Sequence, residues 1–324
     1  MSNPFARPAR MIRRFAELKS EHGLGEALRL SILRYALRAE DTLPLARVNR
    51  AGLFRTDPDA IHAEERQQIR ASSLVVDASR VEQSYPEVFE AEGRFLRYGF
   101  KPARGRSQGL VVLFHGHDAF LHMGPMKAWE TFDLLAPWDT FGFQRQGSWF
   151  WGEKGDNATE RLIQGLIAQV QAEKPGLPWF ATGGSMGGFG ALYHGIKHGA
   201  SGLYVVCPQV DIAAKITEYG RADLFNPYGY LQGEAESDIP DLLALAGASP
   251  DLPPLFLIQN QFDHVNPFAE HAQKLVDIYN AKRGWLGLRV HPSIGHGGDG
   301  RQEEAEMFFS LIVERNPPRR ADFG

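Results

Sequence analysis

From about Leu74 onward, short apolar runs bounded by turn residues alternate with longer stretches of helical periodicity. The apolar runs predict strands at RFLRYGFK (94–101), GLVVLFHG (109–116), PWFATGGS (178–185), GLYVVCP (202–208), PPLFLIQN (253–260) and LGLRVHPS (286–293). Helices are predicted between and after them, at 157–174, 187–199, 267–283 and 301–315. Strands that alternate with helices favour right-handed crossovers, so we predict an α/β fold with a mostly parallel sheet and helices on both faces. In such a sheet, functional residues gather at the carboxyl ends of the strands.

Length and composition are those of an ordinary globular protein. The 324 residues can form one large domain with an appendage, and the formal charge of −4 gives no basic field that would suggest nucleic acid as a partner. Cys207 is the only cysteine, which excludes an intrachain disulfide and favours a cytoplasmic location.

The first 75 residues differ from the rest. They contain basic and apolar residues at helical spacing, which predicts an N-terminal helical extension (1–75) ahead of the α/β domain (76–324). These amphipathic helices could pack on the main domain or on a second subunit, or lie as a basic helix on an anionic membrane or polymer. We find no apolar run typical of a signal peptide and none long enough to span a membrane.

The stretch ATGGSMGGFG (181–190) places several glycines around one serine, between a predicted strand and a predicted helix. It fits neither common phosphate-binding pattern, because Phe189 follows Gly188 where a Walker loop needs lysine, and G-x-G-x-x-G spacing is absent from these glycines. It does fit G-x-S-x-G with Ser185 at its centre. A serine on such a strand-to-helix turn is held in a strained conformation that exposes its hydroxyl, so we predict Ser185 as a nucleophile.

An activated serine needs a base and an orienting acid, which follow later strands in enzymes with this turn. Asp263 follows the strand predicted at 253–260, and His296 lies in a glycine-flanked loop after the strand predicted at 286–293. We therefore predict a catalytic triad of Ser185, His296 and Asp263. Asp211 is a rival acid, whereas His291 lies within a predicted strand and His264 is expected to point away from Asp263.

The motifs FHGHD, GGSMGG, NQFDHVNP and SIGHGG together resemble those of the α/β-hydrolase superfamily, over residues from about 90 to 316. The resemblance implies an oxyanion hole formed by the backbone N–H groups of His117 and Met186. It also implies a serine esterase that needs no cofactor, and the aromatic-rich pattern is similar to members associated with bacterial surface-polysaccharide modification.

A metal site is a competing interpretation of another stretch. The stretch HGHDAFLH offers possible ligands at His115, His117, Asp118 and His122. The H-x-H-x-D-H pattern of metallohydrolases does not match, because Asp118 follows His117 directly. The pair His194 and His198 lacks the glutamate of H-E-x-x-H, since Gly195 stands in its place.

The segment 139–160 is rich in aromatic residues. Trp149 and Trp151 could belong to the core or could line the mouth of the site and bind a sugar face or an acyl group. The sequence thus predicts a serine hydrolase that cleaves a carboxylic ester, with a small molecule or a carbohydrate ester as substrate. The alternatives are an acyltransferase with a sugar acceptor, a metal-dependent hydrolase and a non-catalytic binding protein.

Overall fold

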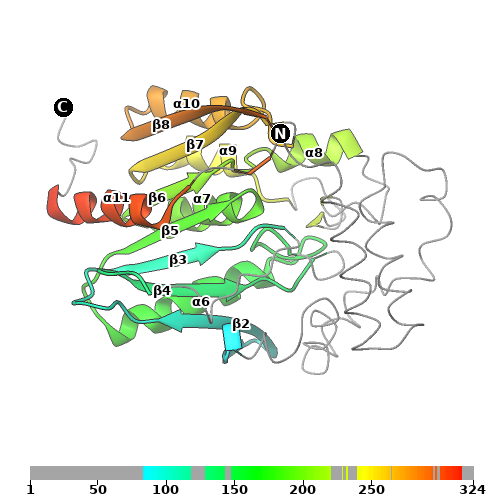
Figure 1. The fold of residues 1–324 in the computed structure, drawn as a ribbon. Coiled ribbons are helices and arrows are strands. Elements are labelled where there is room, and N and C mark those ends of the chain that lie inside the picture. Colours follow the sequence, from blue (N-terminus) through cyan, green and yellow to red (C-terminus); the bar gives the residue numbers. More distant parts are fainter. Residues whose placement is uncertain are drawn as a thin grey trace, which may run out of the picture.

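The computed structural model describes residues 83–117, 128–142, 147–219, 228, 231–232, 239–263, 265–294, 296–297 and 300–315. These residues form one sheet of eight strands (Figure 1). The spatial order of the strands is β1 (Glu87–Ala91), β2 (Arg94–Lys101), β4 (Asp133–Trp138), β3 (Leu110–Phe114), β5 (Trp179–Gly184), β6 (Gly202–Val206), β7 (Leu255–Phe262) and β8 (Leu286–Ile294). All neighbours from β4 to β8 are parallel, whereas β1 pairs antiparallel with β2 and β2 with β4. The mostly parallel sheet is therefore confirmed.

Two strands, β1 and β4, were not predicted from the sequence. β1 joins β2 through a tight turn in which Glu92 and Gly93 both have positive φ, 54° and 72°, the conformation that a two-residue hairpin requires. β4 contains Pro137, which argues against a strand inside a sheet. Proline is tolerated there because β3 pairs with β4 only as far as Leu135, so no ladder bond to β3 is lost at Pro137.

Four helices match predicted stretches: α6 (Ala158–Glu173), α7 (Met186–Lys197), α10 (Ala272–Ala281) and α11 (Gln302–Arg315). Two shorter helices, α8 (Ile212–Tyr219) and α9 (Leu242–Ala248), were not predicted because they are too short for a clear period. Asn157 lies at the N-cap of α6, but its side chain makes no capping bond and instead donates to Glu160 at 3.1 Å.

Side chains that alternate along the strands form a core on each face of the sheet. Val112, Ala181 and Leu203 belong to one cluster together with residues of α6, α7, α9 and α10. Val111, Phe180 and Tyr204 point the other way and cluster with Phe308 and other residues of α11. Helices on both faces are thus confirmed, and the face that carries α11 is the less covered of the two among the described residues.

The predicted N-terminal extension (1–75) lies outside the described residues, so its fold and its contacts stay predictions. In the part of the chain that the structure describes, every helix is too short or too polar to cross a lipid bilayer.

Candidate active site

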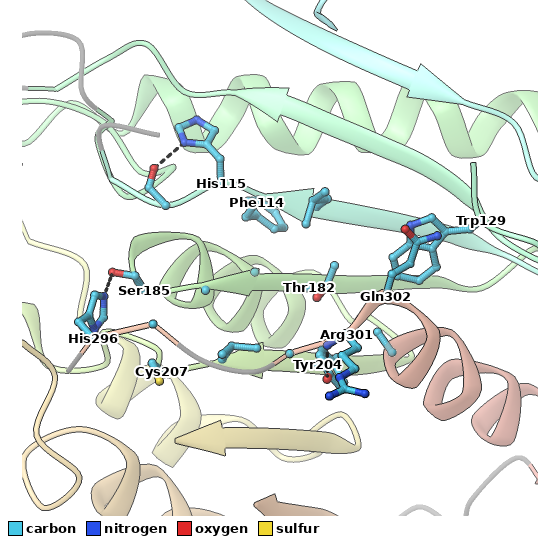
Figure 2. A pocket seen from close by; sticks show the side chains of 18 residues that line it. Phe114, His115, Trp129, Thr182, Ser185, Tyr204, Cys207, His296, Arg301 and Gln302 are labelled. Carbon is cyan, nitrogen blue, oxygen red and sulfur yellow. Dashed lines mark hydrogen bonds between the residues drawn. The ribbon is translucent and has the colours of Figure 1, made fainter. Parts of the chain in front are cut away.

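The three residues predicted from strand ends come together at the carboxyl edge of the sheet. Ser185 lies between β5 and α7, Asp263 directly follows β7, and His296 lies just beyond β8. In Figure 2, Ser185 and His296 point toward each other and are joined by a hydrogen bond, at one end of the group of residues that line a cavity. The parallel topology explains this meeting, because parallel strands all end at the same edge.

Ser185 has a conformation that side chains rarely adopt, with φ of 55° and ψ of −121°. Such a conformation costs about 1–3 kcal/mol and persists only where its surroundings enforce it. Three backbone hydrogen bonds do so here: the N–H of Ser185 donates to Val206 O at 3.0 Å, and its carbonyl accepts from the N–H groups of Phe189 and Gln209, both at 3.1 Å. The serine is therefore held on a rigid turn.

The glycines around Ser185 allow backbone segments to approach closely. A Cβ on Gly183 would lie 2.3 Å from the carbonyl oxygen of Gly187, and one on Gly187 would lie 2.2 Å from the carbonyl oxygen of Phe114. Since real side chains never come so close to backbone, these two positions require glycine. They bring the start of α7 against the ends of β5 and β3, which places Ser185 next to the loop that follows β3.

His296 connects the serine to the acid. Its Nε2 lies 2.8 Å from Oγ of Ser185, and its Nδ1 lies 2.9 Å from Oδ2 and 3.1 Å from Oδ1 of Asp263. A neutral imidazole that donates from Nδ1 to the carboxylate keeps the lone pair of Nε2 free to accept the serine proton. The arrangement can therefore move a proton off Ser185.

Asp263 has a fully buried side chain that is held in several directions. Besides His296, its carboxylate accepts hydrogen bonds from the backbone N–H groups of Val265 at 2.9 Å and Asn266 at 3.0 Å. Burial acts to raise the pKa of Asp263, but the bonds from His296 and from these amides outweigh it, and the pKa is lowered. The group therefore carries a negative charge next to the imidazole at neutral pH.

The rival acid lies elsewhere. Asp211 forms an ion pair with Lys274 at 2.7 Å and accepts a hydrogen bond from the N–H of Ala214 in the first turn of α8. Both of its carboxylate oxygens thus have local structural roles. His291 lies inside β8, as predicted, and His264 is outside the described residues.

The predicted oxyanion donors lie on adjoining segments. Met186 is the first residue of α7, where backbone N–H groups have no acceptor within the helix, and the helix dipole adds positive potential. His117 follows β3, whose end touches Gly187 through Phe114. The two segments meet where Gly187 packs against the backbone of Phe114 and His115, and the roles of both N–H groups stay predictions.

His115 fixes the loop that carries His117. Its Nδ1 lies 2.8 Å from the carbonyl oxygen of Gly116, and its Nε2 accepts a hydrogen bond from the N–H of Asp139 at 2.9 Å. Burial lowers the pKa of His115 to about 4, so the ring is neutral at physiological pH. Both ring nitrogens are engaged, and His115 is therefore unsuited to bind a metal ion.

The rest of the rival metal site has little support. Asp118 and His122 lie outside the described residues, and within the described ranges no three His, Cys, Asp or Glu side chains gather as metal ligands would. His194 is buried, and its Nε2 lies 2.8 Å from the carbonyl oxygen of Phe150, which gives this histidine a structural partner.

Trp149 and Trp151 lie in the core. Their exposed fractions are 1% and 7%, and both belong to the cluster on the α7 face of the sheet. Neither is among the described residues that line the cavity beside Ser185. Of the two alternatives that the sequence left open, their surroundings match the core.

A cavity of about 460 Å³ touches both Ser185 and His296. Its other walls come from the sheet face that carries α11 and from that helix, and they include Leu113, Thr182, Tyr204, Val206, Trp129 and Ala305. Trp129, Arg301 and Gln302 are seen at the end opposite Ser185 in Figure 2. Its largely apolar walls suit a ligand with an apolar portion.

Asp139 and Gln209 also support the site, and sequence analysis did not single them out. Asp139 follows β4, so recognising that strand would have placed it at the functional edge of the sheet. Gln209 has no motif around it, and its contact with the serine turn is made through its backbone, which any residue could supply.

No protein-family model and no curated protein matches the sequence. Among solved structures, an acylaminoacyl peptidase of Pyrococcus horikoshii matches with a TM-score of 0.52 at 14% identity, over 70% of this chain and 40% of that one. MPT51 (FbpC1) of Mycobacterium tuberculosis matches with a TM-score of 0.52 at 13% identity, over 70% of this chain and 97% of that one. A capsule O-acetyltransferase of Neisseria meningitidis serogroup A matches at 17% identity, over 70% and 93% of the two chains, but its TM-score of 0.49 supports no argument.

These likenesses show the fold. The chain has the α/β-hydrolase fold, as the resemblance in its motifs predicted. At such low identities, the activities of the matched proteins say nothing about this one.

Proposed function

We propose that the protein is a serine hydrolase that cleaves carboxylic esters through an acyl-enzyme. The observation that carries this proposal is the continuous hydrogen-bonded chain from Ser185 Oγ through His296 to the buried carboxylate of Asp263. A nucleophile, a base and an orienting acid in this order form the arrangement that activates serine on unrelated folds.

In the first step, Oγ of Ser185 attacks the ester carbonyl carbon while Nε2 of His296 takes its proton. A bond forms between Oγ and carbon, and the carbonyl electron pair moves onto oxygen. The backbone N–H groups of Met186 and His117 would hold the resulting oxyanion. One such donor is typically worth about a hundred- to a thousandfold in rate.

The tetrahedral intermediate then expels the alcohol. The carbon–oxygen bond of the ester breaks, and the leaving oxygen takes the proton from Nε2 of His296, which leaves an acylated Ser185. A water molecule repeats the sequence with His296 as base, and the carboxylic acid and free Ser185 are the products.

Asp263 supports both halves of the reaction. Its carboxylate keeps the Nδ1 proton in place, which presents the unprotonated Nε2 to Ser185, and its charge stabilises the imidazolium that forms transiently. The lowered pKa of Asp263 supports this role, because the carboxylate must stay ionised while His296 is charged.

The cavity next to Ser185 suggests where an apolar part of the ester would lie. A carbohydrate ester remains a prediction from sequence similarity alone. The structural argument for a carbohydrate substrate was that a sugar stacks on Trp149 or Trp151. This argument is weakened because both rings are buried.

The test is ester hydrolysis by the full-length chain and by Ser185→Ala. We expect p-nitrophenyl acetate and butyrate to be cleaved by the wild-type protein, with the rate lost in the variant and unchanged by EDTA. Full activity of Ser185→Ala combined with inhibition by EDTA would overturn the proposal in favour of a metal enzyme.

A second measurement separates hydrolysis from acyl transfer. With a sugar alcohol added as acceptor, a hydrolase releases the same amount of free acid as before. If a new sugar ester appears at the expense of free acid, and only with Ser185 intact, the enzyme is an acyltransferase instead.

A further inference from the structure

Trp149 links the two segments that would form the oxyanion hole. Its indole ring stacks on the ring of His117, with centroids 5.3 Å apart and planes inclined by 27°. Its Nε1 donates a hydrogen bond of 2.6 Å to Oε1 of Gln209, and the backbone N–H of Gln209 donates to the carbonyl of Ser185 at 3.1 Å. One buried side chain thus touches the loop after β3 and a residue bonded to the nucleophile turn.

The loop that contains Trp149 (147–150) also contacts Met186, the residue that carries the other predicted oxyanion donor. A Cβ on Gly147 would lie 2.5 Å from Cε of Met186, so the Met186 side chain packs directly against the loop backbone. The segment from Gly147 to Phe150 therefore lies against both His117 and Met186, the residues whose N–H groups are predicted to hold the oxyanion.

This loop has an unusual backbone that needs strong support. Trp149 and Phe150 have φ of 55° and 57°, in the left-handed region that residues with side chains avoid. The buried carboxylate of Asp139 supplies the support: it accepts hydrogen bonds from the N–H of Ser148 at 2.7 Å and of Phe150 at 2.8 Å, on either side of Trp149.

Asp139 further connects the loop to the segment after β3. Its own N–H donates to Nε2 of His115, the residue that precedes Gly116 and His117. Trp149 is thus fixed at its backbone by Asp139 and at its side chain by Gln209, and its position relative to His117 is set by both.

We propose that Trp149 is a positioning residue that sets the spacing between the two oxyanion donors, the N–H groups of His117 and Met186. This inference rests on the proposed serine hydrolysis and replaces the predicted contact of Trp149 with substrate. Donors of this kind act by being already aimed at the charge that develops in the transition state. A small displacement would therefore weaken binding of the transition state and leave ground-state binding of the ester almost unchanged.

The experiment compares Trp149→Phe, which keeps an aromatic ring but removes the N–H donor, with Trp179→Phe. Trp179 is also buried, at 5% exposure, but it lies at the start of β5, the end far from Ser185. We expect Trp149→Phe to lower kcat by roughly ten- to a hundredfold with little change in KM. We expect Trp179→Phe to change neither.

A transition-state analogue gives the readout that a purely structural role would not move. Affinity for a trifluoromethyl ketone, which forms an oxyanion on Ser185, should fall in Trp149→Phe by the same factor as kcat/KM. Gln209→Leu removes the acceptor of the same hydrogen bond and should produce a similar loss. In the double variant the combined loss should be smaller than the product of the two single losses, because the Trp149–Gln209 hydrogen bond can be broken only once.

Gln209→Leu keeps the experiment decisive if Trp149→Phe does not fold. The proposal is overturned if the folded variants keep wild-type kcat and analogue affinity, or if KM alone rises. Labelling of Ser185 by a fluorophosphonate distinguishes failure of this inference from failure of the proposed function. If Ser185 is labelled but the Trp149 and Gln209 variants keep wild-type kcat and analogue affinity, only this inference fails. If Ser185 is not labelled, the proposed function itself fails.

Discussion

Nε2 of His296 lies 2.8 Å from Oγ of Ser185, although 111 positions separate the two residues in the chain. The parallel topology brings both residues to one edge of the sheet, and a further hydrogen bond fixes the loop that carries His296. The side-chain amide of Asn260, on β7, donates to the carbonyl of Gly297, and Gly297 has a φ of 112° that glycine adopts without strain. The loop that carries His296 is thus tied to the strand that leads to Asp263.

Replacing the acid should remove most of the activity without disturbing ester binding. We expect Asp263→Asn to lower kcat by roughly a thousand- to ten-thousandfold, because an amide no longer holds the imidazole in the required tautomer. The measurement is steady-state kinetics on a p-nitrophenyl ester. Asp211→Asn is the matched control, since Asp211 pairs with Lys274, and equal losses in both variants would contradict the assignment of the acid.

The serine turn should not tolerate a single added methyl group. In Gly187→Ala the new Cβ would lie 2.2 Å from the carbonyl oxygen of Phe114, so the backbone must shift. We expect a loss of about 1–3 kcal/mol in the free energy of unfolding, or more, measured by urea denaturation.

A second glycine serves as the control for this prediction. Gly247 lies in α9, and a Cβ there would meet no atom within 4 Å. Gly247→Ala should therefore stabilise the protein, by about 0.5–1 kcal/mol, because alanine has less freedom to lose on folding. Equal stability of the Gly187 and Gly247 variants would show that the turn is less tightly packed than described.

Glu160 should contribute stability that depends on pH. Burial acts to raise the pKa of this carboxyl, but bonds from His198 and Lys197 outweigh it and lower the pKa from 4.5 to about 2. Because the folded pKa lies below the ordinary value, the ionised group stabilises the fold above about pH 4.5, and this contribution is lost as the pH falls toward 2.

Glu160→Gln should accordingly lower the free energy of unfolding at pH 7 by roughly 1–3 kcal/mol. The difference from the wild-type protein should shrink as the pH falls below 4.5. Urea denaturation at several pH values measures it, with the exposed Glu303→Gln as control. A difference that is constant with pH would contradict the account.

The sequence allowed the parallel sheet and the positions of Ser185, Asp263 and His296 to be predicted because each depends on local signals. A glycine-rich turn after an apolar run, and polar residues just beyond later runs, mark the functional edge of a sheet without any knowledge of strand order. The structure brings these three side chains together, and their catalytic roles remain to be tested.

What sequence analysis missed depends on contacts between distant segments. Proline is unusual inside a sheet, and Pro137 is acceptable in β4 because β3 pairs with β4 only as far as Leu135. Without β4, Asp139 had no recognisable place at the sheet edge. The burial of Trp149 was left open for the same reason, because a tryptophan between glycines can line a site or fill a core. The hydrogen bonds from the backbone N–H groups of Ser148 and Phe150 to Asp139, which hold Trp149 in the core, join distant segments and cannot be read from the sequence.

The most direct test of the account is covalent labelling of the full-length protein with a fluorophosphonate probe, followed by mass spectrometry of its peptides. We predict one modified residue, Ser185, with labelling abolished in Ser185→Ala and slowed at least a hundredfold in His296→Ala, as expected for a serine that needs its base. Labelling at another serine, or ester hydrolysis without any labelling of Ser185, would contradict the central claim that Ser185 is the nucleophile.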